Sequence, residues 1–232
     1  MSDGENDRSL AGWLTRVGQT LQGRIRFPFS DLPSSGADRV YAARTVRPFL
    51  EAMRNIDAAV ILDLGPAIGP NVSFLGEHLS CKIHVEDLYA DIDQLARTGQ
   101  EDGLTSFLTT RLTHEPGSVD GVLAWDLFDY LRSGEAKALA RQLVTMLKPG
   151  GVVMALFTTV LRDEASFRKY VIVDAGHLRH HRVPSARCAK RVWLGRDVEQ
   201  LFAPLEVAES HLLTHRQRET LLRQPLANRK ER

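Results

Sequence analysis

Residues 59–72 read AVILDLGPAIGPNV, and this stretch decides the fold that we expect. An apolar run ends in the acid Asp63, and two glycines follow at Gly65 and Gly69. A strand, a glycine turn and a helix in this order form the front edge of a nucleotide-binding α/β unit. Glycines let the backbone pass close to a ligand, and the helix N-terminus offers free N–H groups. The stretch therefore predicts a nucleotide site at the end of the first sheet strand.

The spacing of the glycines indicates which kind of nucleotide the turn can bind. A G-x-G-x-x-G fingerprint holds a pyrophosphate with closely spaced glycines, and here Ala67 stands where the middle glycine would be. The chain also has no G-x-x-x-x-G-K-[ST] loop of the kind that cradles the phosphates of a nucleoside triphosphate. We therefore expect a ligand without a diphosphate.

Strands and helices alternate from residue 59 onward. We expect strands at 59–64, 81–86, 119–125 and 152–157, and helices at 68–78, 89–98 and 133–147. Residues 103–112 read either as a weak third strand or as an irregular loop. A short helix at 196–203 and a hairpin of strands at 205–213 and 217–223 follow. This pattern predicts an α/β fold with a doubly wound, mostly parallel sheet and an antiparallel edge strand from the C-terminal hairpin.

The residues before this alternation predict helices. Helical spacing of apolar residues indicates one helix at 10–22 and another at 37–55, with a kink or a break at Pro48.

Composition bounds the class of protein. The 232 residues are 43% hydrophobic, which is enough for the core of a single domain, and the formal net charge of +1 gives no global reason to expect nucleic acid. No apolar run approaches the length of about 20 residues that spans a bilayer. The polar, acidic start and the two distant cysteines, Cys81 and Cys188, indicate a cytoplasmic protein with reduced thiols and no membrane partner.

Acidic residues close two further strands of the expected sheet. Glu86 and Asp87 end the second strand, where an acid can accept both ribose hydroxyls of a nucleoside, and we prefer Glu86. Asp126 follows Trp125 at the end of a later strand, so it falls on the same rim as the glycine turn. Trp125 is equally consistent with core packing and with ligand contact.

Together with LKPGG at residues 147–151, these stretches resemble the class I S-adenosylmethionine-dependent methyltransferases. The resemblance covers about residues 59–157, with a continuation to 223. LDLGPAIG is similar to the first motif of that family, HVED to its ribose-binding motif, and residues 120–131 to its fourth motif. The resemblance implies a seven-stranded Rossmann-like sheet, S-adenosylmethionine as cofactor, and an enzyme that transfers a methyl group.

The resemblance also implies a set of cofactor-binding residues. These are Asp63, Gly65, Pro66, Ala67, Gly69, Glu86, Asp87, Trp125 and Asp126. The family often has an acid that takes the adenine amino group, and residues 107–114, FLTTRLTH, offer none, so backbone groups or a threonine hydroxyl are the alternatives. The implied organisation is an N-terminal helical segment over the cofactor at 1–56, a methyltransferase domain at 57–225, and a tail at 226–232.

Residues 165–193 interrupt the alternation with a basic, histidine-rich insertion. We expect this segment and the N-terminal helices to form the pocket of the methyl acceptor. Asp126, His177, His180 and His181 are candidates for a catalytic base, with no preference among them, and we expect no metal. The acceptor is expected to be a small molecule, and O-, N- and C-methylation stay open, as does a homodimer. The alternative is a binding or scaffold protein of this fold with weak or no catalysis.

Overall fold

The computed structural model describes residues 39–161 and 165–226, which lie in the compact unit Ser34–Arg232. The expected helix at 10–22 falls outside the described residues.

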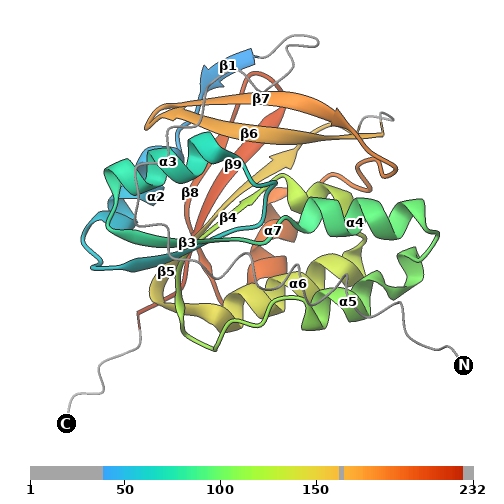
Figure 1. The fold of residues 1–232 in the computed structure, drawn as a ribbon, viewed down its shortest axis with the longest axis horizontal. Coiled ribbons are helices and arrows are strands. Elements are labelled where there is room, and N and C mark those ends of the chain that lie inside the picture. The colour runs from blue at the N-terminus through green and yellow to red at the C-terminus, as the bar shows by residue number, and fades with distance from the viewer. Residues whose placement is uncertain (1–38, 162–164, 227–232) are drawn as a thin grey trace, which may run out of the picture. The chain divides into compact units, whose positions relative to one another are not determined.

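A six-stranded sheet forms the centre of the described residues (Figure 1). Its order is β3 (Cys81–Val85), β2 (Ala59–Asp63), β4 (Val119–Trp125), β5 (Leu147–Thr158), β9 (Gln217–Arg223) and β8 (Glu206–Leu212). The first four strands pair in parallel, and β9 is antiparallel to both of its neighbours. The expected mostly parallel, doubly wound sheet is thus confirmed, with six strands where the resemblance implied seven.

The C-terminal hairpin adds its strands in an order that we did not expect. The antiparallel strand β9 lies inside the sheet, between β5 and β8, and the edge strand is β8. Burial explains this order, because Leu221 and Leu222 of β9 are covered on both faces, whereas most of β8 is exposed. The more apolar strand therefore takes the interior place.

Residues 103–112 form neither of the structures that we expected. They begin at the last residue of η1 (Glu101–Gly103) and contain the helix α5 (Leu104–Thr110). Leu104 and Leu108 are both fully buried, and their spacing of four places them on one helical face. These two buried leucines, and not the threonines, decide the local structure. The segment is therefore a helix, and the sheet has one strand fewer than the seven that the resemblance implied.

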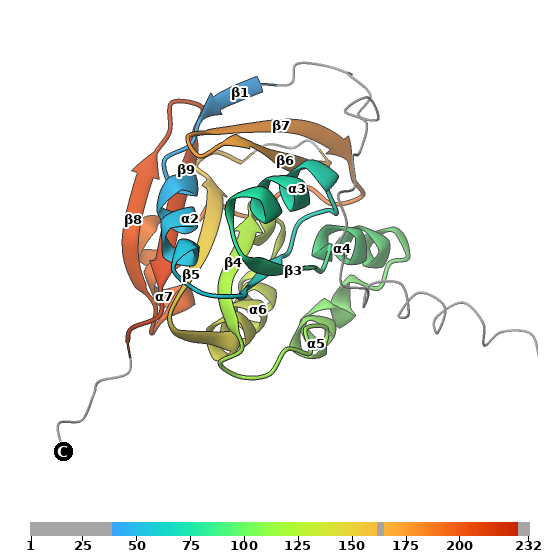
Figure 2. The ribbon, with the colours of Figure 1, turned by 60° about the vertical axis from the view of Figure 1, so that its left-hand side comes forward.

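Helices cover both faces of the central sheet (Figure 2). α2 (Val46–Arg54) and α3 (Gly69–His78) pack on one face, where side chains such as Ile61 and Leu123 point. α4 (Leu88–Arg97), α5, α6 (Ser133–Met146) and α7 (Gly195–Phe202) pack on the other face, where the alternate side chains of the same strands point. The strand alternation thus divides the core into two apolar clusters.

The segment expected as one helix at 37–55 contains a strand and a helix. β1 (Arg39–Ala42) comes first, and α2 begins at Val46. Pro48 lies in the first turn of α2, where the missing N–H group breaks no helical hydrogen bond, so the helix runs on without a break. The expectation of a helix interrupted at Pro48 is therefore wrong.

The basic insertion folds into a hairpin of β6 (Ser166–Asp174) and β7 (His177–Pro184). With β1 it makes a second sheet in the order β1-β7-β6. Asn71 of α3 attaches this sheet to the main domain, because its Nδ2 donates to the Tyr170 carbonyl at 2.8 Å and its Oδ1 accepts from the Ile172 N–H at 2.8 Å.

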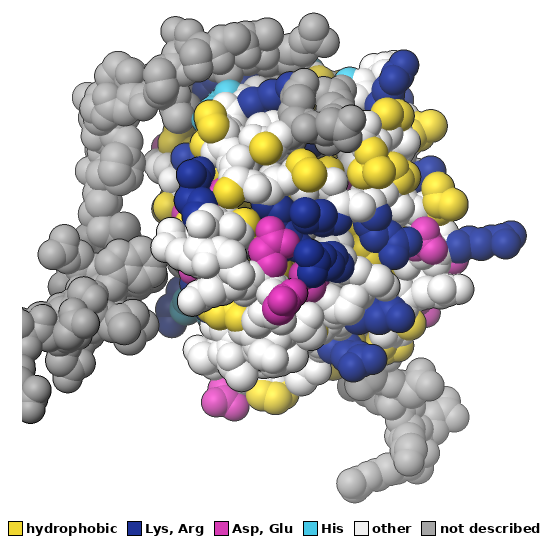
Figure 3. All heavy atoms as spheres, turned by 90° about the vertical axis from the view of Figure 1, so that its right-hand side faces the viewer, with side chains coloured by type: hydrophobic (Ala, Val, Ile, Leu, Met, Phe, Trp, Pro, Cys, Tyr) yellow, Lys and Arg dark blue, Asp and Glu magenta, His cyan; other side chains and the backbone are white. Residues whose placement is uncertain are grey.

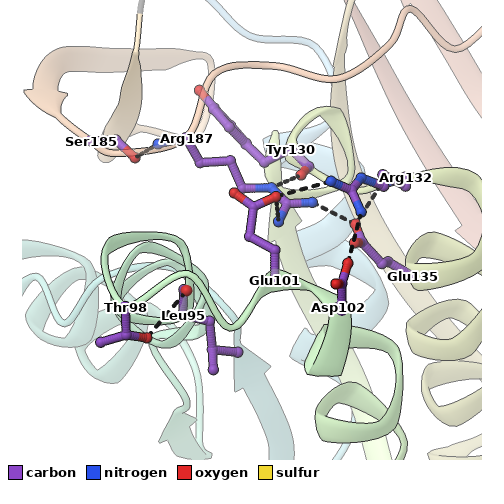
Figure 4. A network of polar contacts seen from close by, with 9 residues as sticks. All are labelled: Leu95, Thr98, Glu101, Asp102, Tyr130, Arg132, Glu135, Ser185 and Arg187. Atoms are coloured by element: carbon purple, nitrogen blue, oxygen red, sulfur yellow. Dashed lines mark hydrogen bonds and ion pairs between the residues drawn. The ribbon is translucent and has the colours of Figure 1, made fainter.

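Arg187 fixes the chain where it returns from the hairpin (Figure 4). Its side chain is 1% exposed, its Nε donates to the Tyr130 carbonyl at 2.7 Å, and its Nη2 donates to Glu135 Oε2 at 2.6 Å. Glu101 approaches Nη1 at 3.4 Å. One buried guanidinium therefore ties the insertion to η2 (Leu127–Tyr130), to α6 and to η1.

We expect Arg187→Met to lower the free energy of unfolding by about 3–5 kcal/mol, because it leaves the Glu135 carboxylate buried without its partner. Urea unfolding at neutral pH measures this loss. Arg196→Met, at an exposed position of α7, is the control and should change stability by less than about 0.5 kcal/mol. An equal effect of the two substitutions would contradict the anchoring role of Arg187.

Candidate functional site

The carboxyl ends of β2 and β4 bring the predicted site residues to one edge of the sheet. Asp63 ends β2, and its Oδ1 accepts from the Gly65 N–H at 2.9 Å and from Trp125 Nε1 at 2.6 Å. Trp125 ends β4, and Asp126 follows it. Asp63, Gly65 and Trp125 therefore lie in contact at one edge of the sheet, with Asp126 next in the chain.

Gly65 lies directly against the Trp125 ring. A Cβ at Gly65 would lie 2.6 Å from both Cδ1 and Nε1 of Trp125, so a larger residue does not fit without a shift of that ring. Gly65 and Pro66 are buried, whereas Ala67 is exposed. The indole ring of Trp125 therefore covers Gly65, the first glycine of the turn.

A second aromatic ring holds Trp125 in this place. Tyr170 of β6 stacks on Trp125 with 3° between the ring planes and 5.5 Å between the centroids. Trp125 itself has a φ of +49°, which non-glycine residues rarely adopt. The hairpin, the strand end and the glycine turn are thus packed as one stack.

Asp126 is fully buried and takes three hydrogen bonds. Tyr89 OH donates to Oδ1 at 2.6 Å, and Tyr170 OH and Arg168 Nη1 donate to Oδ2 at 2.9 and 2.7 Å. Burial and the nearby Asp126 charge raise the pKa values of Tyr89 and Tyr170 well above 10, so both hydroxyls stay protonated as donors. Our sequence analysis missed Tyr89 and Arg168, although Tyr89 is only two residues beyond Asp87.

The two acids at the end of β3 have different partners. Glu86 accepts from Arg111 Nη1 at 2.7 Å and contacts His114 Nε2 at 2.9 Å. Burial alone would raise the pKa of Glu86, but the hydrogen bonds from His114 and Arg111 outweigh burial and lower it. The carboxylate of Glu86 is thus already engaged by the protein.

Asp87 faces the glycine turn instead. It has a φ of +40° and caps α4 by accepting from the Ala90 N–H at 3.2 Å. Burial raises its pKa, while the backbone N–H groups of Ala90 and Ala67 and the charge of Lys169 act in the opposite direction. Of the two acids, Asp87 is the one that interacts with the turn.

Other residues singled out in the sequence make local contacts of their own. Gly69 is the first residue of α3, and the hydroxyls of Thr109 and Thr110 donate to carbonyls of their own helix. His177 is exposed beside Asp174 at the turn of the hairpin. His180 lies on the opposite face of β7, with its ring centroid 5.8 Å from that of Tyr170, so its ring does not converge with those of His177 and His181. Among the described residues, no group of three or more metal-ligating side chains is arranged around a common point.

Charges of both signs occur together on the face that Figure 3 shows. Lys and Arg side chains lie there beside Asp and Glu side chains, with hydrophobic side chains next to them. None of the helices in the described part of the chain is long and apolar enough to span a membrane.

Comparison with known proteins finds likeness in fold alone. No family model matches the sequence, and no curated protein matches it. A SAM-dependent methyltransferase from Methanosarcina mazei is 11% identical, with 78% of this chain and 98% of that one covered and a TM-score of 0.47. The 1,6-didemethyltoxoflavin-N1-methyltransferase of Burkholderia thailandensis, with bound S-adenosylhomocysteine, is 14% identical, with 78% of each chain covered and a TM-score of 0.44. The [4+2]-cyclase SpnF is 12% identical, with 79% and 82% covered and a TM-score of 0.47.

The order and direction of the strands in the central sheet identify the type of fold. Four parallel strands carry the glycine turn and the acids at one edge, and the C-terminal hairpin inserts an antiparallel strand beside β5. This is a Rossmann-like sheet of the class I methyltransferase type, with one strand fewer than the seven of that family.

Asp63 makes stability depend on pH. Burial raises its pKa from 3.8 to about 6, although hydrogen bonds from Trp125 and Gly65 act against the shift. Between these two values the folded chain holds the proton and the unfolded chain does not, so stability falls as the pH rises. Relative to Asp63→Asn, we expect the parent to lose about 2 kcal/mol between pH 4 and pH 7.

Urea unfolding of both proteins at the two pH values tests this expectation. Asp102→Asn is the matched control, because the Asp102 side chain is fully exposed and its removal should leave the pH dependence of the parent unchanged. A constant difference between the parent and Asp63→Asn would show that Asp63 stays ionised in the folded protein.

Proposed function

We propose that this protein is an S-adenosylmethionine-dependent methyltransferase that acts on a small molecule. One observation carries the proposal. A sheet of the class I type brings the glycine turn and the carboxylates of Asp63 and Asp87 to one edge, the edge where open α/β sheets bind their ligands. The low similarity to solved structures adds no further argument.

The residues at this edge of the sheet fit the nucleoside half of S-adenosylmethionine. Asp87 is partly exposed and lies at the turn beside the exposed Ala67, so its carboxylate is available to ribose hydroxyls. The methionine half does not fit this conformation, because the Trp125 ring covers Gly65 and the Asp126 carboxylate is saturated with donors. Binding of the whole cofactor therefore requires Trp125 and Tyr170 to move.

The roles of the chain's own residues follow from this arrangement. When bound, the cofactor supplies a methyl group on a positively charged sulfur, and the protein contributes alignment of the acceptor and exclusion of water. Asp87 holds the ribose, and the backbone of residues 65–67 lines the nucleoside. We assign no base, because Asp126 accepts from three donors and contacts no solvent, and the three histidines do not converge on one point, since His180 lies on the opposite face of β7 from His177 and His181.

The same observation about Trp125 favours a second candidate function. If the rings of Trp125 and Tyr170 stay in place, the chain keeps the fold and uses its own side chains where the family holds the methionine group. The protein would then act as a binding or scaffold protein without methyl transfer. Calorimetric titration with S-adenosylmethionine and S-adenosylhomocysteine separates the two functions, since an enzyme binds both and a scaffold binds neither.

Asp87→Ala should weaken S-adenosylhomocysteine binding by at least about tenfold, because charge-assisted hydrogen bonds to the ribose are lost. Glu86→Ala should weaken it less, because the carboxylate of Glu86 is engaged by Arg111 and His114. Calorimetry on both variants measures the order, and Asp102→Ala serves as a neutral control. A larger loss of affinity in Glu86→Ala than in Asp87→Ala would assign the ribose contact to Glu86.

Tyr170→Ala should strengthen S-adenosylhomocysteine binding by about tenfold, because it removes the ring that holds Trp125 over Gly65. Tyr170→Phe keeps the ring and is the matched control, with affinity close to that of the parent. Circular dichroism establishes that both variants are folded before titration. Absence of binding in the parent and in folded Tyr170→Ala alike would rule out the methyltransferase and leave the scaffold.

A further inference from the structure

Three buried oxygen atoms near the N-terminus of α2 have no hydrogen-bond partner among the described residues. They are Oε1 of Glu219, Oγ1 of Thr45 and the hydroxyl oxygen of Tyr41. The side chains of Glu219 and Thr45 are fully buried. Because nearly all buried polar atoms in folded proteins are hydrogen-bonded, each exception calls for an explanation such as a bound ion. Three exceptions in one region therefore point to a ligand.

The carboxylate of Glu219 brings together the elements that carry these atoms. Its Oε2 accepts from the backbone N–H groups of Arg44 and Thr45 at 2.6 and 3.2 Å, so β9 meets the chain where α2 begins. Tyr41 belongs to β1, the strand that leads into this segment. Burial and then the charge of Glu219 raise the pKa of Tyr41 well above 10, so a protonated hydroxyl lies close to the carboxylate.

Glu219 has no cationic partner in the described part of the chain. His211, which acts on its pKa, is itself hydrogen-bonded to Glu209 at 2.9 Å. Burial raises the pKa of Glu219, and the N–H groups of Arg44 and Thr45 act in the opposite direction. A buried carboxylate is costly unless a positive charge and hydrogen bonds surround it. The free oxygen Oε1 therefore favours a cation that can also donate hydrogen bonds.

The site lies just below the surface of the protein. Tyr41 is partly exposed although its hydroxyl oxygen is buried, and its ring centroid is 4.2 Å from that of His215 and 5.6 Å from that of His180. β1 is a strand of four residues at the edge of its sheet, where it pairs with β7 alone. A local displacement of this short strand gives access, and the close packing admits only a small group.

We propose that Glu219, Thr45 and Tyr41 bind an ammonium group, either that of a small primary amine or the free ammonium ion. A primary ammonium has three N–H donors and one positive charge, and the site offers three acceptor oxygens and one carboxylate. A divalent metal ion is disfavoured, because such ions take more oxygen ligands and usually several carboxylates. The proposal goes beyond the proposed methyl transfer and does not depend on it.

Thermal unfolding at neutral pH tests the site with three chloride salts at equal ionic strength. Ammonium and methylammonium carry N–H donors, whereas potassium is a cation of similar size without them. We expect the parent protein to melt about 3 °C higher in about 100 mM of the preferred ammonium salt than in potassium chloride, because a ligand of the folded state stabilises it. A higher melting temperature in methylammonium identifies an organic amine as the ligand, and a higher one in ammonium identifies the free ion. A melting temperature in potassium chloride equal to that in both ammonium salts would overturn the proposal.

Glu219→Gln should abolish the difference between the salts, because it removes the charge and keeps the shape of the side chain. Glu206→Gln is the matched control, since it removes an exposed carboxylate of β8 and should keep the difference of the parent. Tyr41→Phe removes one acceptor, leaves the carboxylate in place and should reduce the difference, so it tests the site even where Glu219→Gln does not fold. An undiminished difference in Tyr41→Phe or in folded Glu219→Gln would show a general salt effect and overturn the proposal. These results are independent of whether the protein binds S-adenosylmethionine.

Discussion

The buried carboxylate of Asp126 is the interaction on which the rest of the site depends. It joins the end of β4 to α4 through Tyr89 and to the hairpin through Tyr170 and Arg168. An ionised group without solvent contact is very unfavourable unless donors surround it, so each of these three partners is needed where it stands. The position of the hairpin over the sheet edge follows from this requirement.

The same constraint links the hairpin to the glycine turn. Tyr170 satisfies Asp126 and also stacks on Trp125, which covers Gly65. Arg168 satisfies Asp126 from the same strand of the hairpin. A change at Asp126 therefore alters the contacts of the glycine turn and of the hairpin together. Substitutions of residues that share partners in this way are expected to have non-additive effects.

The sequence allowed the central sheet to be predicted because parallel strands buried on both faces appear as short apolar runs, and 59–64 and 119–125 are such runs. It favoured Glu86 over Asp87 for the ribose, and it gave no sign that Glu86 is engaged by Arg111 and His114, which lie 25 and 28 residues further along the chain. The helix at Leu104–Thr110 was missed since its threonines favour a strand, while two buried leucines decide the structure. Arg168 was one of several basic residues in the insertion at 165–193, and only the folded hairpin places it on a buried acid.

The contact between Gly65 and Trp125 has a consequence for how the sequence can vary over time. At a separation that leaves no room for a Cβ, alanine at position 65 is compatible only with a smaller or shifted side chain at position 125. Substitutions at the two positions are therefore not independent, and the effect of one depends on which residue occupies the other. Among descendants of this chain, the glycine and the tryptophan are expected to be inherited or lost as a pair.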